Sequence, residues 1–163
     1  SKTELQTAPS IPDGLNSWYI SQPAFTLINN DASNIFYQWD SEEVIDYEGS
    51  FGLENTPNNA NLTGGILELN YWSDVCDNSE SHFRKIIKTD FSDPIIKNLE
   101  PEDESTVVNN PRPLIRALLD EIYQSNSGIE KSKVSMFLDA IKINPKIIKT
   151  GMDPYVINIP ISQ

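Results

Sequence analysis

The chain has 163 residues, of which 38% are apolar, and its 12 basic and 24 acidic side chains give a net charge of −12. Such an acidic surface repels phosphate backbones and anionic lipid, so binding to nucleic acid or to an anionic membrane surface is disfavoured. The sequence holds no run of eighteen apolar residues, which argues against membrane insertion.

The composition favours an all-β fold. Three Trp, six Tyr and six Phe suit strands, and eleven Pro with seven Gly interrupt the chain too often for a helical bundle. The single cysteine, Cys76, excludes an internal disulfide, and we expect it to be a buried apolar side chain. The single histidine, His82, has no second His or Cys at ligand spacing, which disfavours a zinc site and a thiol or imidazole enzyme.

In chain order, residues 1–11 are expected to be a linker. The first strand is expected at Ala24–Ile28, which is apolar and β-branched and runs into a polar turn. The second is expected at Ile35–Trp39, because large side chains there alternate with the period of two that places one set on a core face.

The next short strand is expected at Val44–Tyr47, and residues 54–65 are expected to form an exposed hairpin loop. A strand at Ile66–Ser73 should turn Leu67, Leu69 and Tyr71 inward and Trp72 to the opposite face. The last strand of this part is expected near Phe83–Lys88.

Short motifs frame residues 12–94. The stretch opens with Pro12-Asp13-Gly14-Leu15-Asn16-Ser17-Trp18-Tyr19 and closes with Tyr71-Trp72-Ser73-Asp74, Asn78-Ser79-Glu80 and Asp90 to Pro94. It resembles the immunoglobulin-like repeats of large archaeal and bacterial surface proteins and of the C-terminal arms of exported proteases. The resemblance implies an immunoglobulin-like β-sandwich over 12–93, an extracellular or cell-surface location, and core positions for Trp18 and Trp39. Ser17 and Asp77 stand where the family usually has Gly.

A second unit is expected over 94–163. Its motifs are Ile95 to Pro101, Thr106-Val107, Arg112 to Ala117, Ser127-Gly128-Ile129 and Val134 to Asp139. They resemble a second bacterial immunoglobulin-like domain, so the chain is predicted to contain two tandem immunoglobulin-like β-sandwich domains.

The segment Leu114 to Tyr123 admits two interpretations. Its apolar residues fall at helical spacing, with Pro113 suited to a first helical turn and Gly128 beyond the end. The resemblance instead implies a buried strand through about Ala117, and we favour the strand.

The resemblance also implies that the second domain lacks its last strands, because the segment Tyr155 to Ile161 is normally followed by further hairpins. Either the chain is cut short, or a strand arrives from a neighbouring molecule by strand complementation. Self-assembly through the second domain and contact with neighbouring domains of the same polypeptide are the partners that we expect.

The acidity lies mainly in the first unit. Residues 1–93 hold four Lys or Arg against fifteen Asp or Glu, whereas residues 94–163 hold eight against nine. Several of these carboxylates come near the junction, and calcium takes several oxygen ligands, so a calcium site there is a hypothesis. Its candidate ligands are Asp74, Glu80, Asp90 and Asp93, with Asp120 as a further possibility.

The sequence predicts no catalytic residue, because it contains no nucleophile, phosphate-loop or metalloprotease motif. We therefore expect a noncatalytic module, which acts as a stalk, spacer or assembly domain of a larger secreted or cell-surface protein. The alternative is an accessory domain of a secreted hydrolase that binds substrate or glycan, with Trp72 as a candidate stacking platform if its ring is exposed.

Overall fold

The computed structural model describes residues 2–75, 78–102, 115–121, 126–138, 140–149 and 155–159. Over these residues the chain is mostly antiparallel β-strand, as the composition predicts, and no helix in them is long and apolar enough to cross a membrane. The chain divides into two compact units. The first comprises Ser1–Ser92 with Ser125–Ser127, and the second comprises Asp93–Gln124 with Gly128–Gln163.

The first unit contains seven strands in its described residues, one short helix, α1 (Ala60–Thr63), and two 3-10 turns at Leu15–Ser17 and Pro57–Asn59. The strands are β1 (Glu4–Ala8), β2 (Ala24–Ile28), β3 (Asn34–Trp39), β4 (Ile45–Asp46), β5 (Gly64–Val75), β6 (Asn78–Ser79) and β7 (Phe83–Asp90). The strands predicted at 24–28 and 35–39 are confirmed, and those predicted at 66–73 and 83–88 are confirmed but longer.

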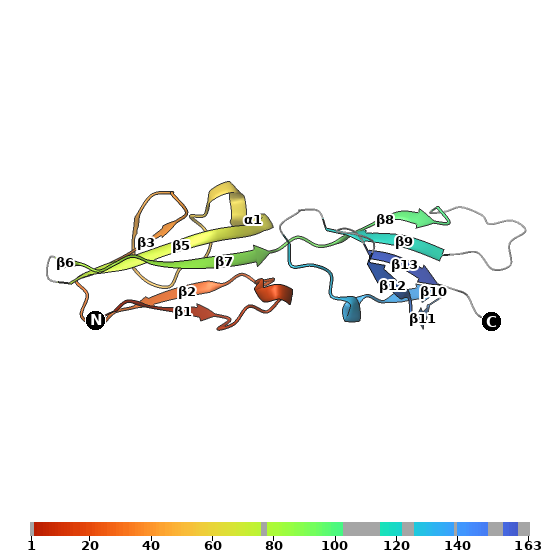
Figure 1. Cartoon of the computed structure of the whole chain (residues 1–163), viewed down its shortest axis with the longest axis horizontal. Helices are drawn as coiled ribbons and strands as arrows, with labels where there is room; N and C mark the ends of the chain where they lie inside the picture. The colour runs from red at the N-terminus through yellow and green to blue at the C-terminus, as the bar shows by residue number, and fades with distance from the viewer. Residues whose placement is uncertain are drawn as a thin grey trace, which may run out of the picture. The chain divides into compact units, whose positions relative to one another are not determined.

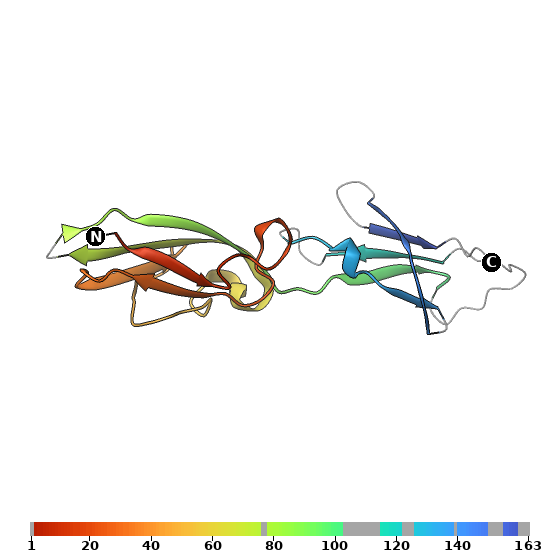
Figure 2. The same ribbon diagram turned by 90° about the horizontal axis from the view of Figure 1, so that it is seen from below.

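These strands form two layers (Figures 1 and 2). One layer is the pair β1–β2, and the other has the order β4-β3-β5, with β6 and β7 both pairing β5. Side chains that alternate along β2, β3, β5 and β7 fill the space between the layers, and among the most deeply buried are Phe25, Trp39, Leu69 and Ile87. The period-two pattern therefore predicts the core face correctly, and Trp18 and Trp39 are both buried as expected.

Phe51 fastens one layer to the other. It follows β4, yet its backbone N–H donates to the Phe25 carbonyl at 3.0 Å and its carbonyl accepts from the Phe25 N–H at 2.8 Å. Its ring stacks on Tyr37, with 3.8 Å between centroids, and meets the edges of Trp39 and Tyr47. Aromatic pairs of this kind contribute about 0.5–1.5 kcal/mol each beyond the area that they bury.

The stretch expected to be a linker contains a strand, which corrects that prediction. β1 pairs antiparallel with β2, with Leu5 opposite Leu27 and Thr7 opposite Phe25. Glu4–Ala8 carries only one large apolar side chain, Leu5, which packs against the core. Local sequence therefore gives little sign of this strand, and the partner strand is what orders it.

Residues 54–65 are not one exposed hairpin loop, contrary to expectation. They contain the turn Pro57–Asn59 and α1, whose Ala60 is buried in the core, and β5 already begins at Gly64. Gly64 has φ 86°, and a Cβ atom there would lie 2.2 Å from the Thr89 carbonyl oxygen. Only glycine fits where β5 begins so close to β7.

The second unit has a four-stranded sheet in the order β12-β13-β9-β8 and a separate hairpin, β10–β11. The strands are β8 (Ile95–Glu100), β9 (Ile115–Asp120), β10 (Met136–Leu138), β11 (Ile141–Ile143), β12 (Lys146–Lys149) and β13 (Tyr155–Ile159), with a 3-10 turn at Lys131–Lys133. β9 confirms the strand interpretation, but the strand continues past Ala117 to Asp120. Several sequence motifs lie outside the described residues, namely Cys76, Asp77, Thr106-Val107 and residues 111–114.

The core between the layers should dominate the stability of the first unit. Leu69→Ala removes a side chain that is fully buried and should lower the free energy of unfolding by about 2–5 kcal/mol. Ile66→Ala, on the same strand with a side chain that is 54% exposed, should change it by about 0.5 kcal/mol or less. All three Trp lie in the first unit, so urea unfolding followed by Trp fluorescence reports this unit alone. Equal losses in the two variants would contradict the placement of the core.

Candidate functional site

A hydrogen-bond network around the half-buried carboxylate of Glu80 joins Thr3, just before β1, to Ser73 on β5. Glu80 accepts hydrogen bonds from the Thr3 N–H at 3.2 Å, from the Thr3 hydroxyl, and from the Ser73 hydroxyl at 3.0 Å. Asn29 donates from Nδ2 to the same two hydroxyl oxygens. Thr3 and Ser73 are buried, so this network is shielded from water on one side.

These contacts act on the acidity of Glu80. Burial raises the pKa of the Glu80 carboxyl, but the hydrogen bonds from Thr3 and Ser73 outweigh that effect and hold the pKa below its usual value. A carboxylate that accepts several hydrogen bonds is stabilised in its charged form. Glu80 therefore acts as an acceptor that ties three segments of the chain together.

A second carboxylate, that of Asp90, lies buried at the end of β7. Asp90 Oδ1 accepts from the Ser92 hydroxyl at 2.7 Å, and Oδ2 accepts from the Ser127 N–H at 2.7 Å. Burial raises the pKa of Asp90, whereas the hydrogen bonds from Ser127 and Ser92 lower it, and the net direction is down. The Asp90 carboxylate thus holds the backbone at Ser92 and at Ser127 in place.

The two carboxylates lie at opposite ends of the first unit, which corrects the expectation that the calcium candidates gather near its exit. Gly64 pairs with Asp90 and Asp74 pairs with Ser79, ten residues further along β5. At the rise of a strand this separation is about 33 Å. Glu80 and Asp74 therefore lie far from Asp90 and cannot share one cation with it.

The remaining calcium candidates do not complete a site in the described residues. Asp93 is exposed, and Asp120 forms an ion pair with Lys97 in the second unit. Among the described residues no group of three or more His, Cys, Asp or Glu is arranged to hold a metal ion. The sequence alone could not reveal the distance between the candidate calcium ligands, because that distance depends on the length of β5.

Trp72 lies on the outer face of its sheet, as predicted, but its ring is covered. Only 9% of the residue is exposed, because the ring stacks between His82, at 3.9 Å between centroids, and Phe36, at 5.7 Å. A sugar ring would have to displace His82 to reach the indole. The expectation of an exposed stacking platform at Trp72 is therefore wrong.

The acidic loop after β3 offers no converging pair of carboxylates. Asp40 accepts from the Glu68 N–H on β5 at 2.9 Å, whereas Glu42, Glu43 and Asp46 are exposed around an open hollow. General acid and base chemistry requires two carboxyls held together in a cleft. This loop has no such arrangement.

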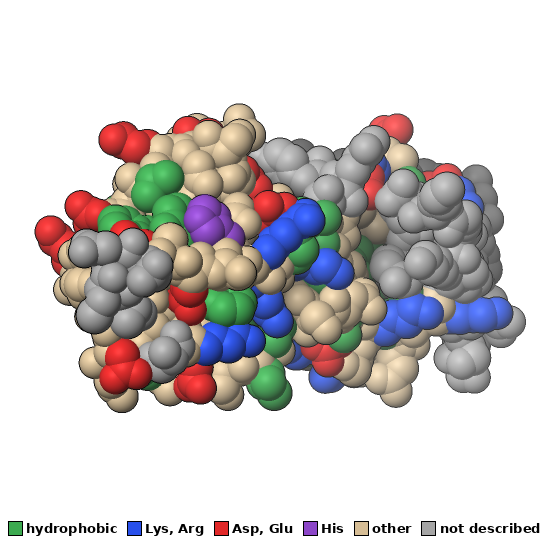
Figure 3. Space-filling model, turned by 60° about the vertical axis from the view of Figure 1, so that its left-hand side comes forward, with side chains coloured by type: hydrophobic (Ala, Val, Ile, Leu, Met, Phe, Trp, Pro, Cys, Tyr) green, Lys and Arg blue, Asp and Glu red, His purple; other side chains and the backbone are tan. Residues whose placement is uncertain are grey.

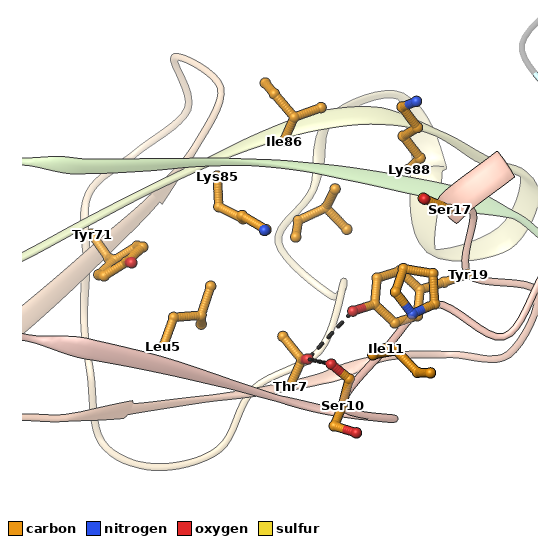
Figure 4. A pocket seen from close by; sticks show the side chains of 12 residues that line it. Leu5, Thr7, Ser10, Ile11, Ser17, Tyr19, Tyr71, Lys85, Ile86 and Lys88 are labelled. Atoms are coloured by element: carbon orange, nitrogen blue, oxygen red, sulfur yellow. Dashed lines mark hydrogen bonds between the residues drawn. The ribbon is translucent and has the colours of Figure 1, made fainter.

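A groove in the first unit runs along β7, between this strand and β1 (Figure 4). It encloses about 540 Å³. Leu5 and Thr7 of β1 line one side, Lys85–Lys88 of β7 line the other, and Tyr71 and Tyr19 close it. Apolar side chains together with the ammonium groups of Lys85 and Lys88 suit the binding of an extended, partly acidic ligand.

Sequence reasoning did not identify this groove, although one signal was available. Three of the four basic residues among the first 93 fall within five positions, at Arg84, Lys85 and Lys88. The other half of the groove comes from β1, which the sequence did not reveal. Comparisons with protein-family models, curated proteins and solved structures gave no match to this chain.

The two carboxylates should make the first unit sensitive to acid. Their pKa values are lower in the folded than in the unfolded chain, so their stabilising contribution is present above the unfolded value, about 4. It is lost as pH falls through the unfolded and then the folded pKa. Urea unfolding between pH 7 and pH 3 should therefore show a falling free energy of unfolding.

Glu80→Gln isolates one of the two contributions. Since the amide cannot accept as strong hydrogen bonds, this variant should lose about 1–3 kcal/mol at pH 7 and show a flatter dependence on pH. Glu48→Gln, at an exposed carboxylate, is the matched control and should follow the parent protein. A Glu80→Gln curve parallel to the parent at all pH values would show that Glu80 does not contribute.

Proposed function

We propose that this chain is a noncatalytic structural module, a spacer or stalk segment of a larger cell-surface or secreted protein. The observation that supports this best is the path of the backbone through the first unit. The chain begins at the Glu80 end, where Thr3 is held, and leaves at the Asp90 end, where Ser92 is held. A unit traversed from one end to the other adds length to a polypeptide, whereas one whose ends meet does not.

The directions of the outermost strands also suit this role. β1 starts beside Glu80, and β7 starts three residues after it, so both strands run from the Glu80 end to the Asp90 end (Figure 2). Tension on the chain then acts along the axes of β1 and β7. The hydrogen bonds of β1 to β2 and of β7 to β5 share such a load, because they are sheared together rather than opened one by one.

The proposal includes two tandem immunoglobulin-like sandwiches and an extracellular location. The two-layer first unit, the separate second unit and the motifs of residues 12–94 support it. Neighbouring domains of the same polypeptide are the proposed partners. Assembly through the second unit is supported by β8, which stands at the end of its sheet with all six residues exposed.

The alternative role, an accessory glycan-binding domain, receives less support. It depended on an exposed aromatic face, and the ring of Trp72 is covered by His82 and Phe36. Trp18 and Trp39 are buried. The described Trp residues thus serve packing, which favours the spacer role.

Single-molecule pulling tests the spacer role. With handles at Lys2 and Asp93, force follows the natural path, and the first unit should unfold at a clearly higher force than with handles at Asp31 and Glu80. The second pair lies at the Glu80 end, so force there separates the strands one hydrogen bond at a time. Glu80→Gln should lower the force in the first geometry. Equal unfolding forces in both geometries would contradict a load-bearing role.

A further inference from the structure

The outer edge of β7 is open over most of its length. The Lys88 carbonyl accepts from the Tyr19 N–H, and the Asp90 N–H donates to the Tyr19 carbonyl, each at 2.8 Å. These two residues therefore point their backbone groups away from β5. In an antiparallel ladder the direction alternates with every residue, so the N–H and C=O groups of Arg84 and Ile86 point outward as well.

The outward groups of Arg84 and Ile86 have no backbone partner in the part of the chain that the structure describes. There β7 pairs with β5 on one side. On the other side the short parallel bridge between Tyr19 and Thr89 uses only the Lys88 carbonyl and the Asp90 N–H. The outward edge from Arg84 to the N–H of Lys88 is thus free to accept another strand. The groove lies directly beside it.

The opposite wall of the groove is a second open edge. Phe25 directs its N–H and C=O to Phe51, away from β1. Thr7, which stands opposite Phe25, must then direct its own backbone groups away from β2, and Leu5 does the same by alternation. An extended segment in this groove would lie between two strands that both have unused backbone groups.

The charge of this edge is opposite to that of the rest of the unit. Residues 1–93 hold only four basic side chains. Arg84, Lys85 and Lys88 lie on β7, and the Lys2 ammonium lies 4.6 Å from the centroid of the Phe83 ring. Figure 3 shows blue side chains gathered beside green ones on this unit, with red ones around them.

The two lysines of the groove are available for a partner. Arg84 pairs with Glu68, but no described carboxylate pairs with Lys85 or Lys88. Between the two lysines stand Ile86, which is 43% exposed, and Ile87, which is buried. The residues along this edge, Lys85 to Lys88, therefore follow the pattern basic, apolar, apolar, basic.

The same four residues recur on an edge of the second unit. β12 has the sequence Lys146-Ile147-Ile148-Lys149, identical to Lys85-Ile86-Ile87-Lys88, and it stands at the end of its four-stranded sheet. Two copies of such an edge repel each other, because pairing places like charges opposite one another. A strand that pairs with this edge has to bring carboxylates.

We propose that the β7 edge binds an extended segment of a partner protein with the pattern acidic, apolar, apolar, acidic, which adds to the sheet as a further strand. Its backbone pairs with Arg84, with Ile86 and with the N–H of Lys88, and its two carboxylates meet the side chains of Lys85 and Lys88. The pattern reads the same in both directions, so it fits a parallel or an antiparallel strand. This binding role goes beyond that of a spacer and does not depend on it.

The probe is a synthetic peptide of about eight residues, blocked at both ends, with Glu-Val-Val-Glu at its centre, long enough to span the five residues from Arg84 to Lys88. Binding is measured by titration with NMR detection of the backbone amides. We expect shifts and slowed hydrogen exchange at Arg84, Ile86 and Lys88. Affinity should fall as salt is raised, because the charged groups lie at the surface.

Two peptide controls separate charge from strand pairing. Lys-Val-Val-Lys in the same frame should not bind, since its charges repel the edge. Replacement of one central Val by Pro removes a backbone donor and should weaken binding strongly. Equal binding of all three peptides would overturn the proposal, because it would show adhesion without a strand or a charge requirement.

Two protein variants complete the test. Lys85→Glu with Lys88→Glu should weaken binding of the acidic peptide by about tenfold or more. Ile86→Pro removes an N–H that points away from β5 and should weaken binding without disturbing the β5–β7 pair. Lys131→Glu with Lys142→Glu, at two exposed positions in the second unit, makes the same change in net charge and serves as the control.

Trp fluorescence checks that the first unit of each β7 variant is folded, and the spectrum of the backbone amides checks the variant of the second unit. Absence of binding to the parent protein would overturn the proposal and leave the lysines the role of keeping identical edges apart. Binding that is unchanged in the charge-reversed variant, or a titration without shifts on β7, would do so equally.

Discussion

The packing of Phe51 between the two layers is the contact on which the first unit depends. Phe51 belongs to the loop after β4, but it pairs with Phe25 through its backbone and stacks on Tyr37. It thereby joins β2 of one layer to β3 of the other. Because the layers share this cluster, the strands keep a fixed register. That register brings the hydrogen-bonding partners of Glu80 and Asp90 together at the two ends of the unit.

Given that register, the length of β5 sets the scale of the unit. β5 has twelve residues and pairs with β3, β6 and β7. Its two ends hold the carboxylate networks of Glu80 and Asp90, which fix the backbone where the chain begins and where it leaves. The groove beside β7 follows from the same layout, since β1 and β7 are the last strands of their layers on one side.

The sequence predicted what depends on local alternation. The strands around Trp39 and Leu69 and the inward direction of their side chains follow from a period of two, which the residues display directly. β1 could not be found in this way, because Glu4–Ala8 has one large apolar side chain and takes its order from β2. The cover over Trp72 was equally hidden, because His82 belongs to the segment before β7 and reaches the ring only in the folded sheet. The sequence also could not show whether a carboxylate binds a metal ion or accepts hydrogen bonds from hydroxyl groups. Glu80, for example, accepts from Thr3, which lies 77 residues away in the chain.

Amide hydrogen exchange in the free protein tests the central claim most directly, namely that β7 is hydrogen-bonded on one side and open on the other. We expect the amides of Lys85 and Ile87, which point toward β5, to exchange only when the first unit unfolds. The amides of Arg84 and Ile86, which point into the groove, should exchange many times faster, although they belong to the same strand. Uniform protection along β7 would contradict an open edge, and uniform fast exchange would contradict the sheet itself.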